Sequence, residues 1–490
     1  GENRDLSPQF TDQGAVHVFL GHDNGFLDNA DQKVYGALPQ ADGSWKGATS
    51  LRLGQSMAAA DFDGDGACDL AVGALNHAIV GGATGDGAVF VYRGVKASKD
   101  TVGGITSLPV RAWQPTLSSG ASSSLGRWLA AGDLDGDGKA ELAMTHRAHD
   151  ATVGTSVLAN AGAVRVWKGT SLPADPTPTI APVTALNWQV EGQKAQDAYG
   201  ASVTIGDYDG DGDADLLVGH VLLELPAAGG MPASPTDAGV LAVYAGQKGS
   251  LPATAPVMQW AGDASNIRFG IAAAVLPQSA PGKKPALIAY ASNSSDLGPQ
   301  VGRPYWRIPG SPVVKLAMPG QTAGTRFGAA VAFVGDWDGD GQQDLVAGAY
   351  NFDDPKGGEP NTGNTWLWKG PQLGGVPGFE WLDYTGHTGS DQFGYAMAAA
   401  GNFDDDGKPD LAVIARSEDI SVPFSKSYAL NAANVACLGD PTKPTTFKAA
   451  NDVGAVYVFG AGAPLTNAPR WVIYGPQASQ QLDSVAGGFD

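Results

Sequence analysis

Five short acidic segments of this sequence have residue types and spacing that suit calcium. Counted from its first residue, each carries an oxygen-bearing side chain at positions 1, 3, 5 and 9 and a glycine at position 6. Calcium takes about six to eight oxygen ligands, and alternate residues of a tight loop can direct their oxygens at one centre. Glycine at position 6 permits a sharp turn because it adopts positive φ without steric cost. The segments therefore predict about five bound Ca²⁺ ions.

The predicted ligands follow one scheme in every loop. Position 7 would contribute its backbone carbonyl, which lets its side chain vary. Solvated Asp-Gly turns without metal are the alternative, but unpaired carboxylates so close together would repel and raise their own pKa values. The predicted metal-site residues are Asp61, Asp63, Asp65, Ala67 and Asp69; Asp133, Asp135, Asp137, Lys139 and Glu141; Asp207, Asp209, Asp211, Asp213 and Asp215; Asp336, Asp338, Asp340, Gln342 and Asp344; and Asn402, Asp404, Asp406, Lys408 and Asp410.

The loops differ from EF-hands in their surroundings. No glutamate stands at position 12, and Asp69 runs directly into the apolar segment LAVGA at 70–74. An EF-hand loop needs a glutamate there. Each acidic loop is therefore predicted to connect two strands of a β-hairpin.

The acidic loops belong to a longer repeat, which predicts the fold. The first copy begins at Leu53-Gly54, continues through the acidic loop and ends with the alternating segment GAVFVYRG at 87–94. Loop starts recur roughly every 60–85 residues, enough for a four-stranded propeller blade. A copy at 269–310 keeps the strands but has PQSAPGKKP at 277–285, where Lys283 and Lys284 would oppose a cation. We expect no metal site in that copy.

A seventh copy is divided between the two ends of the chain. The sequence begins with a second-half pattern ending in GAVHVFLG at 14–21 and finishes with a first-half pattern, DSVAGGFD, at 483–490. The chain is predicted to be all-β: a single seven-bladed β-propeller over 1–490. Terminal strands would pair in blade seven, about 471–490 plus 1–21, and this closure removes exposed sheet edges. The joined loop, with Asp490, Glu2 and Asp5, is one residue short, so no well-formed metal site is expected there.

The repeats resemble the FG-GAP repeats of integrin α-subunit propellers and their bacterial relatives. The matching segments include FGAAVAFVGDWDGDGQQDLVAGA at 327–349 and FGYAMAAAGNFDDDGKPDLAVIA at 393–415. The resemblance implies a seven-bladed ring, calcium in the hairpins, and a role in adhesion or ligand binding outside the cell. The high alanine and glycine content favours a bacterial relative.

Composition limits the partners and the location. The net charge of −20 argues against nucleic acid, because no basic stripe offsets it. No run of eighteen apolar residues is present, so we expect no transmembrane segment, and no signal peptide is recognisable. The chain starts at Gly1 without a methionine, which suggests a mature or trimmed product, secreted or outer-membrane-associated if bacterial. Cys68 and Cys437 are predicted on opposite faces and are not expected to pair.

The longest and most varied loops are predicted on the face opposite the acidic loops. They span about 144–162, 219–239, 349–364 and 415–454, and binding usually resides in long loops on a rigid scaffold. Residues that begin such loops could contact a ligand, but ordinary rim residues that bond to water or backbone are the favoured interpretation. Zinc is not expected, because the histidine spacing matches no compact site. The candidate ligand-binding residues are His77, His146, His220, Tyr290, Tyr350 and Arg416.

A tryptophan precedes the first strand of most repeats. A ring of sugar-stacking aromatics is one interpretation, but packing between blades is favoured because large rings bury the most area. The residues are Trp45, Trp113, Trp188, Trp260, Trp381 and Trp471.

The sequence favours a recognition or adhesion module over an enzyme. It would bind a protein or glycan through the face opposite the acidic loops, and it could belong to a surface complex. The alternative is a calcium-dependent polysaccharide lyase or another carbohydrate-active enzyme. Elimination needs a base and a charge-neutralising group in one cleft, and the best candidates are His146, Arg147 and His149.

Overall fold

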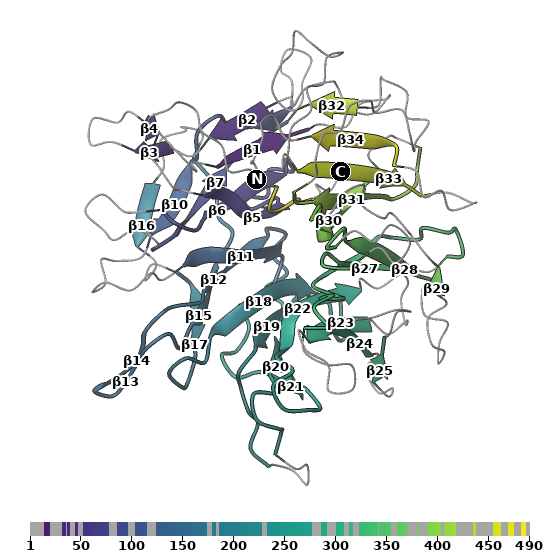
Figure 1. Ribbon diagram of the computed structural model, residues 1–490. Helices are drawn as coiled ribbons and strands as arrows, with labels where there is room; N and C mark the ends of the chain where they lie inside the picture. The colour runs from purple at the N-terminus through teal and green to yellow at the C-terminus, as the bar shows by residue number, and fades with distance from the viewer. Residues whose placement is uncertain are drawn as a thin grey trace.

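A computed structural model shows an all-β protein whose sheets are arranged around a common centre (Figure 1). The residues that the structure describes are 14–19, 32–35, 37–39, 45–47, 52–77, 86–96, 103–114, 124–173, 179–182, 186–227, 233–276, 286–291, 300–307, 313–316, 323–341, 343–353, 360–369, 379–380, 390–402, 406–417, 435–437, 454–461, 469–474 and 482–486.

Six repeats each form a sheet of four antiparallel strands whose first strand lies nearest the centre, and two of these sheets carry an additional fifth strand (Figure 1). The first three sheets consist of β5 (Leu53–Ala60), β6 (Asp69–Ala74), β7 (Ala88–Tyr92), β10 (Arg111–Gln114) and β16 (Thr179–Pro182); β11 (Leu125–Gly132), β12 (Glu141–His146), β15 (Ala163–Trp167) and β17 (Trp188–Glu191); and β18 (Tyr199–Gly206), β19 (Asp215–His220), β20 (Val240–Tyr244) and β21 (Met258–Ala261).

The next three sheets continue the same order. They consist of β22 (Phe269–Leu276), β23 (Ala286–Ala291), β24 (Arg303–Arg307) and β25 (Val314–Lys315); β26 (Ala330–Phe333), β27 (Leu345–Ala349), β28 (Asn364–Trp368) and β29 (Phe379–Glu380); and β30 (Phe393–Gly401), β31 (Asp410–Ala415), β33 (Ala455–Gly460), β34 (Trp471–Tyr474) and β32 (Val435–Cys437). The second and third strands are short apolar runs buried on both faces, as expected for sheets packed against neighbours.

Four two-stranded sheets complete the described strands. They are β1 (Ala15–Val18) with β2 (Gln32–Tyr35), β3 (Ala37–Pro39) with β4 (Trp45–Gly47), β8 (Gly94–Val95) with β9 (Gly104–Ile105), and β13 (Ala151–Val153) with β14 (Ser156–Leu158). A search of the described residues finds no helix with the length and apolar character needed to cross a bilayer.

The arrangement is a β-propeller, but the described residues do not show seven complete blades. They show six sheets of four or five strands and the smaller β1–β2 sheet. Residues 1–13 and 487–490, which the prediction assigns to the divided blade and which include its acidic loop, lie outside the described part of the chain. The prediction of seven blades is therefore replaced here by the six larger sheets that the structure describes.

Both ends of the described chain contact the first sheet. Gly14 forms a parallel bridge with Leu53, as Gly87 does with Leu125 one sheet further on. The hydroxyl of Ser484 donates a hydrogen bond to the carbonyl oxygen of Gly54 at 2.5 Å. The two segments thus lie beside β5, next to where a preceding sheet would stand.

Two sheets gain a fifth strand at the outer edge. Strand β16 pairs in parallel with β10, and β32 pairs in parallel with β34. Cys437 ends β32 at this outer edge, whereas Cys68 lines a cavity near the inner strands. The two cysteines therefore occupy different radial positions in the molecule.

Large aromatic rings pack between neighbouring sheets. Trp113 is 1% exposed, and its ring centroid lies 4.9 Å from that of Trp167 in the second sheet. Trp188 and Trp260 are also buried. These three confirm the packing interpretation, and Trp471 is partly buried. The side chains of Trp45 and Trp381 lie outside the described residues.

Close approach of the inner strands requires glycine at specific points. A Cβ on Gly219 would lie 1.8 Å from the carbonyl oxygen of Gly270 in the next sheet, so no other residue fits without movement.

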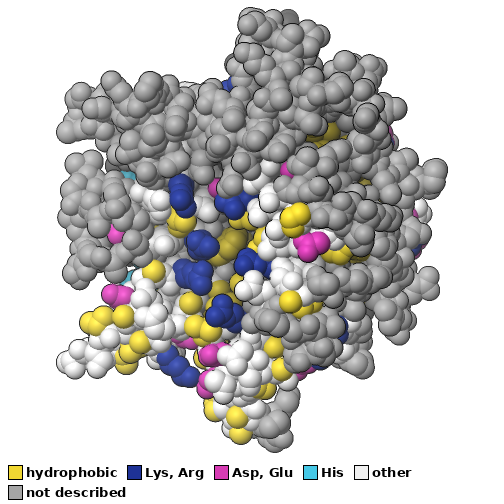
Figure 2. All heavy atoms as spheres, in the orientation of Figure 1, with side chains coloured by type: hydrophobic (Ala, Val, Ile, Leu, Met, Phe, Trp, Pro, Cys, Tyr) yellow, Lys and Arg dark blue, Asp and Glu magenta, His cyan; other side chains and the backbone are white. Residues whose placement is uncertain are grey.

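Figure 2 shows that Lys and Arg side chains gather around the centre of one face of the propeller.

Candidate metal centres

Four of the acidic loops bring carboxylate oxygens together at one point. In each, three carboxylates offer oxygens that all lie within 4.8 Å of one another. Clustered carboxylate oxygens are the donors that calcium prefers, so the chemistry of these sites fits the predicted ion. The clusters are Asp61, Asp63 and Asp69; Asp133, Asp135 and Glu141; Asp207, Asp209 and Asp215; and Asp336, Asp338 and Asp340.

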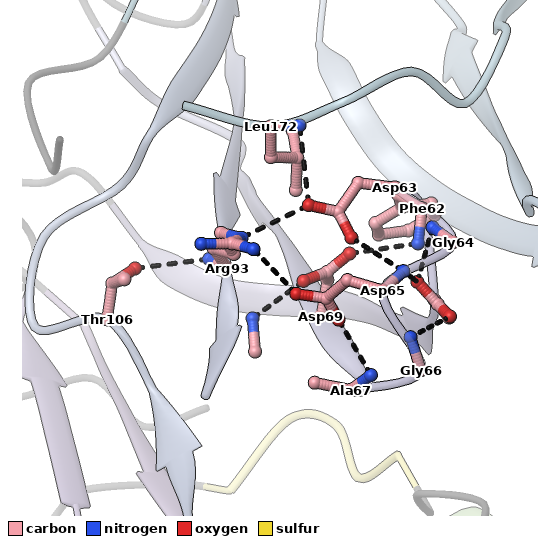
Figure 3. Close-up of polar contacts among 12 residues, drawn as sticks. Phe62, Asp63, Gly64, Asp65, Gly66, Ala67, Asp69, Arg93, Thr106 and Leu172 are labelled. Carbon is pink, nitrogen blue, oxygen red and sulfur yellow. Dashed lines mark hydrogen bonds and ion pairs between the residues drawn. The ribbon is translucent and has the colours of Figure 1, made fainter. Parts of the chain in front are cut away.

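The first loop shows how the backbone holds these side chains (Figure 3). The two oxygens of Asp61 accept hydrogen bonds from the backbone N–H groups of Gly64 at 2.7 Å and Gly66 at 2.6 Å. Asp65 accepts one from the N–H of Ala67 at 2.8 Å. Gly66 has φ of +79°, which favours glycine. The loop therefore folds tightly around its own first and fifth side chains.

The acid at position 9 also joins two distant segments. Asp69 is fully buried and accepts hydrogen bonds from the N–H of Phe62 at 2.8 Å and of Gly94 at 2.6 Å. Equivalent pairs of bonds reach Glu141 from Leu134 and Gly169, and Asp215 from Tyr208 and Gly246. The sequence reasoning assigned position 9 to metal alone and missed this structural role. The side-chain types give no direct signal of it, because the donors are backbone N–H groups.

Burial changes the acidity of the position-9 side chains. Loss of hydration is the largest cause, and it raises the pKa of Asp69 and Glu141 to about 7 and that of Asp215 to about 6. Hydrogen bonds from the backbone oppose the shift. A divalent cation beside these carboxylates would favour their ionised form.

One buried oxygen in the second loop is suited to a metal ion. Asp135 is 1% exposed, and its Oδ1 atom has no hydrogen-bond partner in the described structure. Buried polar atoms in native proteins are nearly always paired. A calcium ion held with Asp133 and Glu141 would satisfy this oxygen.

A basic side chain directly after the third strand contacts carboxylates of three acidic loops. The guanidinium of Arg93 lies 3.1 Å from Asp63 and 2.6 Å from Asp65 (Figure 3). Lys168 pairs with Asp135 and Asp137 in the second loop, and Lys369 pairs with Asp338. Ala245 occupies the corresponding place in the third sheet, directly before Gly246.

The fifth loop is described in part. The side chain of Asn402 accepts a hydrogen bond from the N–H of Gly407 at 3.0 Å, and Asp406 accepts one from Lys408 at 2.9 Å. Asp410 is fully buried, like Asp69. Several predicted residues lie outside the described part of the chain: Asp404 and Gln342, the split-loop acids Asp490, Glu2 and Asp5, and the lysines Lys283 and Lys284.

The histidines proposed as ligand contacts are buried. His77, His146 and His220 are 1%, 4% and 7% exposed. Burial lowers the pKa of His77 to about 4 and that of His220 to about 3. These residues are neutral at pH 7 and present almost no surface to solvent. The side chain of Tyr290 lies outside the described residues.

The remaining two candidates lie together on the opposite face. The Tyr350 ring lies 5.2 Å from that of Tyr395, and the guanidinium of Arg416 lies 4.7 Å from the centre of the Tyr395 ring. Arg416 also pairs with Asp483 at 2.9 Å, and Arg326 donates a hydrogen bond to the hydroxyl of Tyr350. Sequence reasoning found two members of this group and missed Arg326 and Tyr395.

A group of titratable side chains lies at the same end of the second sheet. Arg165 donates to Nδ1 of His146 at 2.8 Å, and Nε2 of His149 lies 3.0 Å from Glu191. Burial, and then the nearby Arg165, lower the pKa of His149. His146 and His149, which the sequence analysis singled out for catalysis, are therefore neighbours.

The acidic-loop end of the inner strands encloses a cavity of about 500 Å³. Its lining includes Ala59, Ala131, Ile205, Ala214 and Cys68. Small apolar side chains of the first three sheets thus make up much of the lining of this cavity.

Comparison with known proteins identifies the repeat. The model of the FG-GAP repeat matches residues 53–92 and 125–167. These ranges run from β5 to β7 and from β11 to β15. The chain therefore carries FG-GAP repeats in its first two sheets. No curated protein sequence matches the chain.

Solved structures with a similar arrangement have very different sequences. The Dos1 propeller is 11% identical, with a TM-score of 0.37 and coverage of 100% of this chain and 89% of that one. Trypanosoma rangeli sialidase in complex with sialic acid is 10% identical, with a TM-score of 0.37 and coverage of 82% and 56%. The exotype rhamnogalacturonan lyase YesX is 13% identical, with a TM-score of 0.31 and coverage of 81% and 74%.

Proposed function

We propose that this chain with FG-GAP repeats is a calcium-stabilised recognition module. It binds a protein or glycan through the face opposite its acidic loops. The observation that carries the proposal is the contrast between the two ends of the inner strands. One end holds clustered carboxylates in short loops, and the other holds arginine and tyrosine side chains.

Calcium would occupy the five acidic loops. The four described clusters offer three carboxylates each, and the partnerless oxygen of Asp135 supports a ligand at the second. The fifth loop has the same spacing and the same buried position-9 acid, Asp410. The ions would hold the hairpins rigid and thereby position the loops at the other end of the strands.

The two chain ends would complete a seventh blade within one domain. Ser484 makes the same hydroxyl-to-carbonyl bond to the following sheet as Ser56 and Ser202, which donate to Gly126 and Gly270. Gly14 forms the same bridge to the following sheet as Gly87. These contacts support residues 482–486 as a first strand and β1 as a third strand. Closure of the ring would leave no inner sheet edge exposed.

The proposed location is the cell surface or the outside of the cell, by secretion or by attachment to an outer membrane if the source is bacterial. Weak calcium sites of extracellular modules are filled at about 10⁻⁴–10⁻³ M ion. A module of this kind could adhere to a partner alone or within a surface complex.

Thermal unfolding with and without calcium tests the metal part of the proposal. The melting temperature of the whole chain is expected to fall substantially in excess EDTA and to recover when calcium, but not magnesium, is added back. An unchanged melting temperature would remove calcium from the proposal.

A binding screen tests the recognition part. Immobilised glycans and surface proteins are exposed to the calcium-loaded chain and then washed with EDTA. Retention of the chain that depends on calcium is expected on at least one class of ligand. Binding to none of them would count against a recognition role.

A calcium-dependent polysaccharide lyase is the second candidate, favoured by the group around His149. The neutral His149 beside Arg165 could remove the proton next to a uronate carboxyl group while a guanidinium neutralises that carboxylate. The test is the appearance of unsaturated products from uronate polysaccharides. Turnover that is lost in His149→Gln but kept in Lys248→Gln would establish the enzyme.

A further inference from the structure

Six arginines lie at the edge of the propeller opposite the acidic loops, and together they are called the arginine cluster. They stand at the start of a first strand or directly after the end of a second strand. Because first and second strands are antiparallel, these positions share one edge, as the register of Leu125 with His146 shows. The arginine cluster consists of Arg52, Arg127, Arg147, Arg268, Arg326 and Arg416.

Several members act on one another across sheets. Partial burial lowers the pKa of Arg147, and the charges of Arg127 and Arg268 lower it further. Burial raises the pKa of Tyr395, which also lies in the field of Arg416 and Arg127. The second, fourth and sixth repeats thus supply charges to one region. Lys and Arg side chains surround the centre of the face in Figure 2.

Few acids neutralise the cluster. Among the described residues, the one ion pair of the cluster joins Arg416 to Asp483. Arg326 bonds to Tyr350 and Gln300, which carry no charge, and the buried Nε of Arg127 has no hydrogen-bond partner in the described structure. Such a concentration of positive charge is unexpected in a chain with a net charge of −20. An anion at this place would relieve the repulsion.

Three arginines of the cluster also occupy an unfavourable backbone conformation. Arg52, Arg268 and Arg326 have φ of +50°, +53° and +56°. Glycine or asparagine adopts this left-handed region more readily than a long side chain. The residue before each first strand adopts this conformation because of the repeat geometry. Arginine at three of these positions therefore costs conformational free energy, and a binding role would explain why it is kept.

An exposed aromatic ring lies within the cluster. Trp128 of the innermost strand β11 is 40% exposed, and the guanidinium of Arg127 lies 5.7 Å from its ring centre. Ser56 and Ser202 stand at this position in other sheets and are buried. Aromatic faces beside charged groups suit a ligand with an apolar ring face and an anionic edge.

We propose that the arginine cluster binds an acidic oligosaccharide, with sugar carboxylates paired to guanidinium groups and one sugar ring packed on Trp128. Guanidinium groups bind carboxylates through two parallel hydrogen bonds. The inference rests on the proposed function, because it names the ligand class of that same face. Among the described residues, those that line the cavity beside the acidic loops of the first three sheets include no lysine or arginine.

Isothermal titration of the whole calcium-loaded chain with oligogalacturonate tests the proposal. Binding is expected to weaken at least about tenfold in the double variant Arg147→Gln and Arg268→Gln, and to weaken with added salt. The control is Lys248→Gln, which removes one positive charge near the acidic loops, matches the single variant Arg268→Gln in charge and is expected to bind like the parent. Melting temperatures in calcium check that every variant is folded.

Other ligands separate the possible results. A sulfated glucan that binds as well as oligogalacturonate would assign the site to anionic sugars in general and support the proposal, whereas preference for polyglutamate would overturn it. If a neutral glycan or a protein binds and oligogalacturonate does not, the proposed function stands and this inference fails. Should the double variant not fold, Trp128→Ala and Arg268→Gln decide singly, and unchanged affinity in both overturns the assignment.

Discussion

The carboxylate of Asp69 accepts a hydrogen bond from the backbone N–H of Gly94, 2.6 Å away at the end of the third strand. Its other oxygen accepts the N–H of Phe62 within the acidic loop. One buried side chain therefore fixes the loop, the second strand and the third strand to one another. The same connection recurs at Glu141 and Asp215, so the last acid of each of these loops also holds the sheet together.

Replacement of Asp69 by alanine is expected to lower the free energy of unfolding by about 2–4 kcal/mol even without calcium, because two buried backbone N–H groups would lose their acceptor. Urea unfolding in EDTA measures the change. Asp65→Ala is the control, since Asp65 is partly exposed, and its loss should be smaller. Equal losses for the two variants would show that position 9 has no separate structural role.

A lysine at position 245 is expected to reduce the calcium dependence of the third loop. Ala245 occupies the place of Arg93 and Lys168, which pair with loop carboxylates. Ala245→Lys should stabilise the calcium-free chain by up to about 1 kcal/mol and reduce the rise in melting temperature that calcium produces. Thermal unfolding with and without EDTA measures both effects. Lys168→Ala should change them in the opposite direction, and a shift of the same sign in both variants would refute the explanation.

Acid should destabilise the chain partly through His77. Burial lowers its pKa to about 4, below the usual value of about 6.5. Between these values the unfolded chain binds a proton that the folded chain does not. The contribution of His77 to the free energy of unfolding is therefore fully present above pH 6.5. It falls by about 1.4 kcal/mol per pH unit as the pH drops toward 4.

The variant His77→Phe should remove this part of the acid sensitivity. Phe352 makes the same backbone contacts in the fifth sheet, since both residues donate to a carbonyl three residues earlier and accept from a glycine N–H. Urea unfolding at pH 5 and pH 7 measures the difference between the two pH values. The reciprocal variant Phe352→His should increase that difference, and equal values in all three proteins would contradict the assignment.

Removal of residues 482–490 should lower the melting temperature and broaden the unfolding transition if the terminal segments complete a blade. The truncation would expose the inner edge beside β5 and remove the bond from Ser484 to Gly54. Calorimetry compares it with Ser484→Ala, for which a loss of about 1 kcal/mol is expected. A truncated chain as stable as the parent would show that the first sheet does not depend on the C-terminal segment.

The repeated signals allowed much of the fold to be predicted. The spacing of acids from Asp61 to Asp69, followed by an apolar run, predicted a hairpin with clustered carboxylates. This was possible because the acidic side chains and the two strands that they connect are adjacent in the sequence. The buried tryptophans were predictable for the same reason, since Trp113 and Trp188 recur at one position.

The arginine cluster was not predictable in the same way. Arg52, Arg268 and Arg326 share one repeat position before a first strand. Arg127 lies within a first strand, and Arg147 and Arg416 follow a second strand, so the charge is spread over three repeat positions. Only the antiparallel pairing of strands places these positions at one edge. Conversely, His77 and His220 were expected to begin exposed loops, yet both are buried. The ring of His77 lies 5.4 Å from that of Phe90, and His220, the last residue of β19, lies 3.9 Å from the ring of Tyr199.

Strand β16 has a consequence for how such chains can change. It comes from the segment between the third and fourth strands of the second sheet, yet it pairs with β10 at the outer edge of the first. The first two repeats are therefore interleaved rather than merely adjacent. Excision or exchange of one of them would leave an exposed strand edge on the other, so recombination of blades should be better tolerated at other junctions than at this one.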